Sequence, residues 1–139
     1  MKHFLLAIII TASLVVGLIG TSAASAAPPT PSGTLSGPNE AGPYAFGDSV
    51  TFSTTVTGLK GQERPMIYVE CYSVVDGTLL YGQLDHADSV FVLGGGSSLW
   101  WTQRDDADCL AHLYAYGGKE KGVDTIVELA PPVAFTATG

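Results

Sequence analysis

Residues that could carry out chemistry are sparse in this 139-residue chain. Its two cysteines, Cys71 and Cys109, are far apart in the sequence and lack the Cys-x-x-Cys spacing of a redox pair. His86 follows Asp85 in a polar stretch, where a histidine beside carboxylates can bind a metal ion or act as a base. A solvated loop histidine is the commoner explanation of such a pattern, and it is the one that we expect here.

Three other patterns fall short of a recognised site. Asp105-Asp106-Ala107-Asp108 offers the oxygen ligands that calcium prefers, but its spacing matches no complete calcium loop. Gly94-Gly95-Gly96 lacks the following lysine and helix of a phosphate-binding loop. Serine is plentiful, yet no serine lies in a recognisable nucleophile motif. The sequence therefore predicts no catalytic site, no metal site and no cofactor.

The first residues predict export from the cytoplasm. A short basic segment precedes an apolar stretch at residues 4–19, and small residues follow at 21–27. Cleavage after Ala26 suits a signal peptidase, whereas a cut one residue later would place Pro28 directly after it. We therefore expect residues 1–26 to be a signal peptide and the mature protein to be secreted. The alternative is an uncleaved anchor, but the apolar stretch is shorter than the ~20 residues of a usual span.

The chain beyond residue 26 is acidic. It holds five of the six lysine and arginine residues and all 13 acidic residues, so its formal charge is −8. This balance argues against nucleic acid or an anionic membrane surface as the partner, because both require basic patches. Export also indicates the state of the cysteines, because an isolated cysteine pair in a secreted protein is most simply a disulfide. We predict a Cys71–Cys109 bond.

Periodicity predicts the elements that position these residues. Residues 27–43 are rich in proline, glycine and serine and predict a flexible leader, with room for a short edge strand near 33–36. The ordered domain is expected at 44–139, where apolar and polar residues alternate with a period of two and no helical stripe occurs. The expected strands are 50–56, 66–74, 79–81, 89–93, 99–103, 109–116 and 125–129, the last resuming at 133–136. About seven short strands separated by turn signals predict an all-β protein, an antiparallel β-sandwich.

Two motifs carry a resemblance to a known family. The stretch Gly47-Asp48-Ser49-Val50-Thr51-Phe52-Ser53 is similar to the B strand of immunoglobulin-like domains. The stretch Asp105-Asp106-Ala107-Asp108-Cys109 is similar to the Asp-x-Ala-x-Tyr approach to their F strand. The resemblance covers residues 44–138 and implies an immunoglobulin-like antiparallel β-sandwich of about seven strands.

The chain departs from that family at its cysteines. Cys109 stands where the family has a tyrosine, Ala111 stands where it has a cysteine, and the expected B strand has no cysteine. The resemblance places Cys71 on the C strand and Cys109 at the start of the F strand, which are neighbours in one sheet. It therefore implies an intrasheet, cross-strand disulfide in place of the usual bridge between sheets.

If both cysteines point inward, strand alternation places a set of tyrosines on the outer side of the same sheet. Tyrosine offers a large, stiff contact area with a polar tip, which suits the recognition of protein or sugar. Aromatic cross-strand pairs also stabilise sheets without any ligand, so both explanations remain open. The candidate ligand-binding residues are Tyr68, Tyr72, His112, Tyr114 and Tyr116, with Glu70 and Leu110 on the same side.

Adjacent Trp100 and Trp101 would face opposite ways on a strand, with one in the core near the disulfide and the other half exposed. The expected function is that of a secreted, non-catalytic, immunoglobulin-like binding module. It would recognise an extracellular protein or carbohydrate at a cell or particle surface and would not insert into a membrane after signal cleavage. The alternative is a structural or assembly protein that has no separate ligand.

Overall fold

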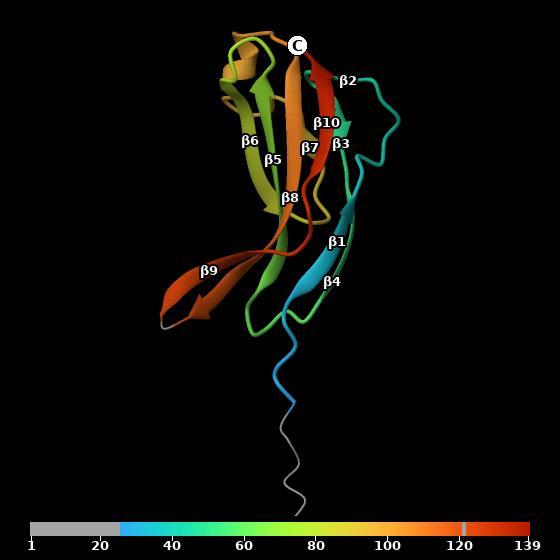
Figure 1. Ribbon diagram of the computed structural model, residues 1–139. Coiled ribbons are helices and arrows are strands. Elements are labelled where there is room, and N and C mark those ends of the chain that lie inside the picture. Colours follow the sequence, from blue (N-terminus) through green and yellow to red (C-terminus); the bar gives the residue numbers. More distant parts are fainter. Residues whose placement is uncertain (1–25, 121) are drawn as a thin grey trace, which may run out of the picture.

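The computed structural model describes residues 26–120 and 122–139. The predicted signal peptide, residues 1–26, lies outside the described residues apart from Ala26. Strands run lengthwise through an elongated domain (Figure 1). In chain order, the elements are β1 (Ser32–Ser36), β2 (Tyr44–Ala45), β3 (Ser49–Val50), β4 (Ser53–Thr57), β5 (Arg64–Ser73), β6 (Leu79–His86), β7 (Phe91–Val92), the 3-10 turn η1 (Leu99–Trp101), β8 (Ala107–Glu120), β9 (Val123–Glu128) and β10 (Val133–Thr138).

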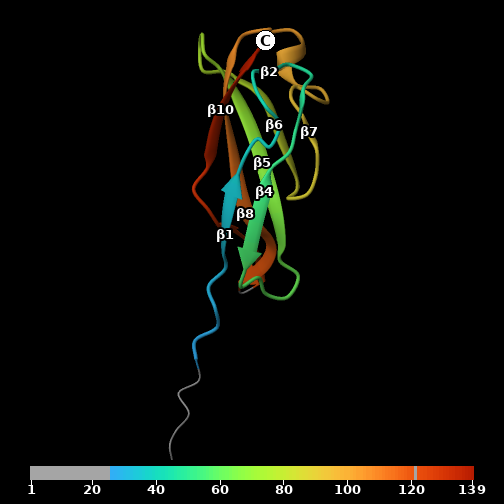
Figure 2. The ribbon, with the colours of Figure 1, turned by 90° about the vertical axis from the view of Figure 1, so that its right-hand side faces the viewer.

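The main sheet is curled and has the strand order β2-β10-β8-β5-β6, with β9 added to the distal part of β8. Two further pairs, β1–β4 and β3–β7, form small sheets of their own. Figure 2 shows β1 and β4 in front of β5 and β8, so they cover the inner side of the main sheet. The expectation of an all-β fold is confirmed.

The strand pairs are antiparallel as expected except for one, because β2 pairs with β10 in the parallel direction and makes the main sheet mixed. The expected strand at residues 50–56 is also divided into β3 and β4. The backbone N–H of Thr51 donates to the Glu40 carboxylate at 2.8 Å, and its carbonyl accepts the N–H of Asn39 at 2.9 Å. These two bonds take the backbone groups that a continuous ladder would need.

The core is built from the inward side chains of the main sheet and of the strands behind it. Ile67 and Val69 of β5 and Leu113 of β8 are fully buried, as the period-two alternation of these strands requires. From the other side, the Phe52 ring meets the Phe91 ring edge-on, with 5.9 Å between the centroids. The core therefore lies between two layers of strands.

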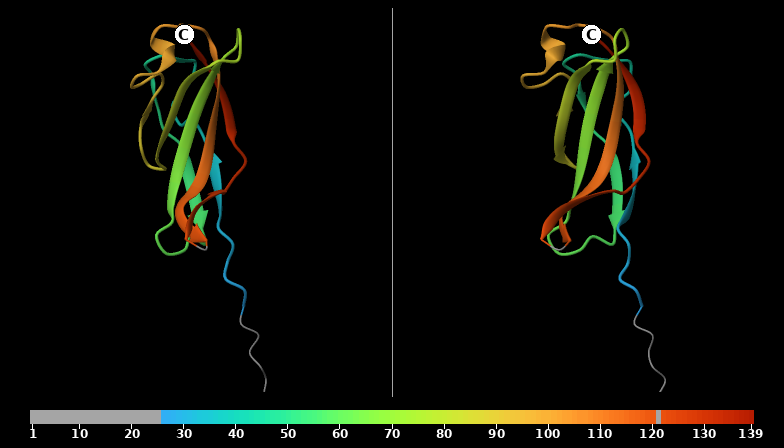
Figure 3. Two further views of the ribbon diagram at one scale, coloured as in Figure 1. Left: turned by 90° about the vertical axis from the view of Figure 1, so that its left-hand side faces the viewer. Right: turned by 60° about the vertical axis from the view of Figure 1, so that its left-hand side comes forward.

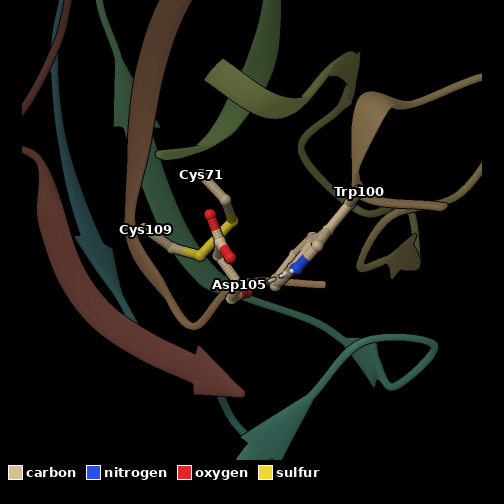
Figure 4. The surroundings of a disulfide bond; sticks show 4 residues. All are labelled: Cys71, Trp100, Asp105 and Cys109. Carbon is tan, nitrogen blue, oxygen red and sulfur yellow. Dashed lines mark hydrogen bonds between the residues drawn. A yellow bond between two sulfur atoms is a disulfide. The ribbon is translucent and has the colours of Figure 1, made fainter. Parts of the chain in front are cut away.

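Cys71 and Cys109 are bonded to each other and are directly opposite in the β5–β8 ladder, with 4.0 Å between their Cα atoms. The predicted disulfide is thus present, and it lies within one sheet. Trp100 is fully buried in the same region, where its indole N–H donates to the Asp105 carbonyl at 2.9 Å (Figure 4). Trp101 is 56% exposed, which identifies the member of the pair that faces the solvent.

The expected strand at residues 99–103 is wrong, because Leu99–Trp101 forms a 3-10 turn. The carbonyl of Leu99 accepts the N–H groups of Thr102 and Gln103, so this segment satisfies its backbone locally rather than in a ladder. The turn still sends the two tryptophans in different directions. A 3-10 turn can therefore place one of two adjacent side chains in the core and the other at the surface, as an extended strand does.

Paired structure begins ahead of Tyr44, the expected start of order. The short edge strand foreseen inside the leader forms as β1 and pairs with β4 along its whole length, from Ser32 opposite Thr57 to Ser36 opposite Ser53. Gly33 is required there, because a Cβ atom at this position would lie 2.8 Å from the carbonyl oxygen of Thr55. The described fold therefore includes part of the segment that composition predicted to be flexible.

The β8–β9 hairpin extends beyond the core at the end of the domain opposite the C-terminus (Figure 1). A register shift between Tyr116 and Gly118 marks a bulge in β8 at Gly117, whose φ of +90° suits glycine. Pro131 and Pro132 then separate β9 from β10, and both of these strands pair with β8. The chain thus uses one long strand, β8, as the partner of three others.

Candidate binding face of the main sheet

The outer side of β5 and β8 carries the predicted tyrosines, and we call it the tyrosine face. Tyr68, Tyr72, His112 and Tyr114 are half-buried, whereas Tyr116 is 40% exposed. The two strands lie in front of β1 and β4 in Figure 3, and the β8–β9 hairpin curves across their lower end. The tyrosine face consists of Tyr68, Glu70, Tyr72, Leu110, His112, Tyr114 and Tyr116.

The register brings most of these side chains together. Tyr68 is directly opposite His112, and Glu70 is directly opposite Leu110. Tyr116 lies apart from this group, opposite Arg64 at the distal end of β5. The tyrosine face therefore has a central group around Glu70 and His112 and an outlying, more exposed tyrosine on the hairpin.

Glu70 contacts two other side chains of the central group, Tyr72 and His112. Its Oε2 accepts the phenolic O–H of Tyr72 at 2.9 Å, and its Oε1 lies 3.3 Å from Nε2 of His112. The other ring nitrogen of His112, Nδ1, lies 3.0 Å from Oε1 of Glu128 on β9. A neutral imidazole has one N–H, so only the protonated ring can donate to both carboxylates at once. The His112 ring also stacks on Tyr114, with 5.7 Å between the centroids and 4° between the planes.

The phenols of the central group lie in a negative electrostatic field. Burial and the charge of Glu70 raise the pKa of Tyr68. The hydrogen bond to Glu70, with burial, raises the pKa of Tyr72. Burial, with the charges of Glu128 and Glu70, raises the pKa of Tyr114. Since each neighbouring carboxylate disfavours the phenolate, this part of the face favours cationic groups over anionic ones.

Two acidic residues at the border of the tyrosine face were missed in the sequence. Glu128 lies opposite Tyr114 and reaches His112 because β9 turns back along β8. No short-range pattern in the sequence predicts this pairing. Asp108 lies opposite Tyr72 because β8 begins at Ala107, ahead of the expected start at Cys109. The period-two alternation of β8 would have revealed Asp108 if the strand had been extended by one pair of residues.

A hollow of about 330 Å³ opens on this face between Tyr72 and β10. Its floor is apolar because β10 contributes Ala134 beside Leu110 of β8. The exposed carboxylate of Asp108 is the charged group in its lining. The hollow is therefore an apolar depression with one negative side chain at its border.

Other groups noticed in the sequence are engaged in structure. Asp105 accepts the hydroxyl of Ser73 at 2.6 Å and the amide of Gln103 at 2.8 Å. His86 is the exposed last residue of β6 rather than part of a loop. Gly95 and Gly96 border a separate groove of about 480 Å³ along β6. Within residues 26–120 and 122–139, no cluster of three histidine, cysteine or carboxylate side chains could hold a metal ion.

A larger hollow, of about 730 Å³, lies between the 60–63 turn and the β8–β9 hairpin. Glu63 closes its inner side by packing over Gly118, where a Cβ atom would lie 2.7 Å from the Glu63 carboxylate. Lys60 and Lys119 also line this hollow, so its charge is mixed. It lacks the concentration of aromatic side chains that distinguishes the tyrosine face.

The disulfide indicates an oxidising compartment. No helix in the described part of the chain is long and apolar enough to cross a membrane. No known protein family, curated protein or solved structure matches the chain significantly.

Proposed function

We propose that this chain is a secreted, non-catalytic binding module with an immunoglobulin-like fold, which recognises a protein or carbohydrate at a cell or particle surface through the tyrosine face. The observation that carries the proposal is the central group of aromatic side chains around Glu70, on the side of the β5–β8 pair that faces away from β1 and β4. Tyrosine is enriched in recognition surfaces because it combines contact area with a hydrogen-bonding tip at small entropic cost.

The arrangement of strands supports the fold part of the proposal. The small sheet β1–β4 lies on the inner side of the main sheet, and the B-like motif runs through β3 to the first residue of β4. The F-like motif leads into β8, which pairs with the C-like strand β5. Secretion is supported by the disulfide, which oxidising compartments maintain.

The alternative is a structural or assembly protein, and the half-buried state of Tyr68, Tyr72 and Tyr114 favours it. Their rings also stabilise the sheet through cross-strand contacts. Replacing all three with serine separates the two functions. Loss of partner binding at an unchanged melting temperature supports recognition, whereas collapse of the fold supports the structural role.

A photocrosslinking side chain at Tyr116 provides the binding measurement. The matched control carries the same side chain at Thr55, which is exposed on β4 behind the main sheet. When the protein is added back to the cells that secrete it, we expect a discrete crosslinked adduct from position 116 and none from position 55. Equal adducts from both positions, or no adduct from position 116, would overturn the proposal.

A further inference from the structure

The hollow beside Tyr72 has the composition of a receptor for a cationic side chain. Leu110 and Ala134 form its apolar floor, and the ring of Tyr72 stands at its side. Asp108 is exposed and has no side-chain hydrogen bond or ion pair within the described chain. By contrast, the neighbouring Asp105 and Asp106 both accept hydrogen bonds within the domain.

The surroundings of the hollow are negative. Glu70 binds the Tyr72 hydroxyl from the other side, and Asp106 lines an adjoining hollow of about 280 Å³ that shares Asp108 and Thr136. Along β5 and the part of β8 that pairs with it, the one lysine or arginine of the described residues is Arg64, at the distal end beside Tyr116. The charge near Asp108 is therefore not balanced by a cation of the same sheet.

We propose that this hollow binds an arginine or lysine side chain of a basic partner protein, with Asp108 as the counter-charge. The inference rests on the proposed function and names the chemistry of the partner. The aliphatic stem of such a side chain would lie on Leu110 and Ala134, while its charged group reaches Asp108 and the ring of Tyr72. Arginine fits best, because its planar guanidinium stacks on aromatic rings and pairs with carboxylates.

Charge complementarity selects a basic protein over a neutral sugar. The chain beyond residue 26 has a formal charge of −8, so the whole domain attracts a cationic partner before contact. The pKa values of Tyr68, Tyr72 and Tyr114, each raised in part by carboxylates, report the same negative field on the face itself. A neutral sugar would gain nothing from this field.

The probe for the test is N-acetylarginine amide, and the matched control is N-acetylcitrulline amide, which has nearly the same shape and no charge. In nitrogen-15 NMR titrations of the folded domain, the arginine probe is expected to shift the amide signals of Tyr72, Asp108, Ala134 and Thr136. Asp108→Asn is expected to weaken this binding by about tenfold or more, since a charged hydrogen bond is lost. Asp88→Asn, an exposed site with the same change in net charge, is expected to bind like the wild type.

A second measurement does not depend on any variant. Added salt should weaken the binding of the arginine probe and leave the signals with the citrulline probe unchanged. Equal binding of both probes, shifts located elsewhere, or an unaffected Asp108→Asn variant would each overturn the assignment. If the arginine probe fails while the crosslink from position 116 persists, the cationic partner is rejected and the binding face stands. Failure of both rejects the face as well.

Discussion

Cys71 and Cys109 lie directly opposite each other on β5 and β8, and their disulfide joins the two strands on the buried side of the sheet. The same register places Tyr68 opposite His112 on the outer side. One covalent bond therefore cross-links the two strands that carry the tyrosine face.

Replacing both cysteines with alanine is expected to lower the free energy of unfolding by ~3–4 kcal/mol, because the bond closes a long loop in the unfolded chain. The sequence separation of the two residues is 38. Urea denaturation of the oxidised wild type and of the double variant measures the difference. Reduction of the wild type should give a similar loss, and a difference below ~1 kcal/mol would contradict a stabilising role.

Alanine variants of Trp100 and Trp101 test how much a buried tryptophan contributes to stability, because the two residues are adjacent but 0% and 56% exposed, respectively. Trp100→Ala is expected to cost ~3–5 kcal/mol through the cavity that it leaves. Trp101→Ala removes surface contacts with Phe46 and Arg104 and the indole hydrogen bond to the Gly96 carbonyl, and should cost less than ~2 kcal/mol. Thermal or urea unfolding compares them, and equal losses would show that the burial of Trp100 is wrongly assigned.

Alanine variants of Gly94 and Gly96 distinguish the cost of steric overlap from the cost of backbone strain. Both have positive φ, +75° and +68°, so alanine strains the backbone at either position. At Gly94 a Cβ atom would also lie 2.3 Å from the Phe46 ring, whereas at Gly96 it meets nothing within 4 Å. Gly94→Ala should therefore be more destabilising by ~1–3 kcal/mol, the cost of overpacking. Equal unfolding midpoints for the two variants would exclude the close approach of Phe46.

Alkaline titration tests the field around Glu70. The pKa of Tyr72 is raised by its hydrogen bond to Glu70, and the charge of Glu70 contributes to raising the pKa of Tyr114. Because these phenols have higher pKa values in the folded state, their contribution to stability is complete below pH ~10 and is lost as the pH rises through the folded values. Tyrosinate absorbance, followed against pH, measures the ionisation.

The matched variant for this titration is Glu70→Gln, which keeps the shape and removes the charge. It should move the ionisation of Tyr72 and Tyr114 to lower pH. Tyr72→Phe identifies the contribution of Tyr72 by deleting it from the curve. A titration unchanged by Glu70→Gln would show that the carboxylate does not act on these phenols.

The sequence predicted those features that depend on local alternation. The period of two in β5 and β8 predicted that the cysteines point inward and the tyrosines outward, and the cysteine pair predicted the disulfide. Features that depend on distant partners were missed. The pairing of β1 with β4 and the parallel contact of β2 with β10 each depend on one short segment, β1 or β2, whose own composition carries little strand signal.

The candidate site shows the same division. Tyr68, Tyr72, His112 and Tyr114 are brought together as the alternation predicts, because they lie on two neighbouring strands. Glu70 was expected on the same side, but two other acidic residues were not foreseen. Glu128 depends on a hairpin whose register shifts at a bulge, and Asp108 depends on where a ladder begins, and neither is encoded by residue type alone.

The separation of the disulfide from the tyrosine face has a practical consequence for protein engineering. The groups that hold β5 and β8 together lie on the buried side, whereas the outward positions are occupied by side chains that contact mainly one another. A library randomised at positions 68, 72, 110, 112 and 114 would therefore vary outward side chains while the disulfide and the buried side chains keep their sequence. The domain offers a small, covalently braced scaffold from which binders of new specificity can be selected.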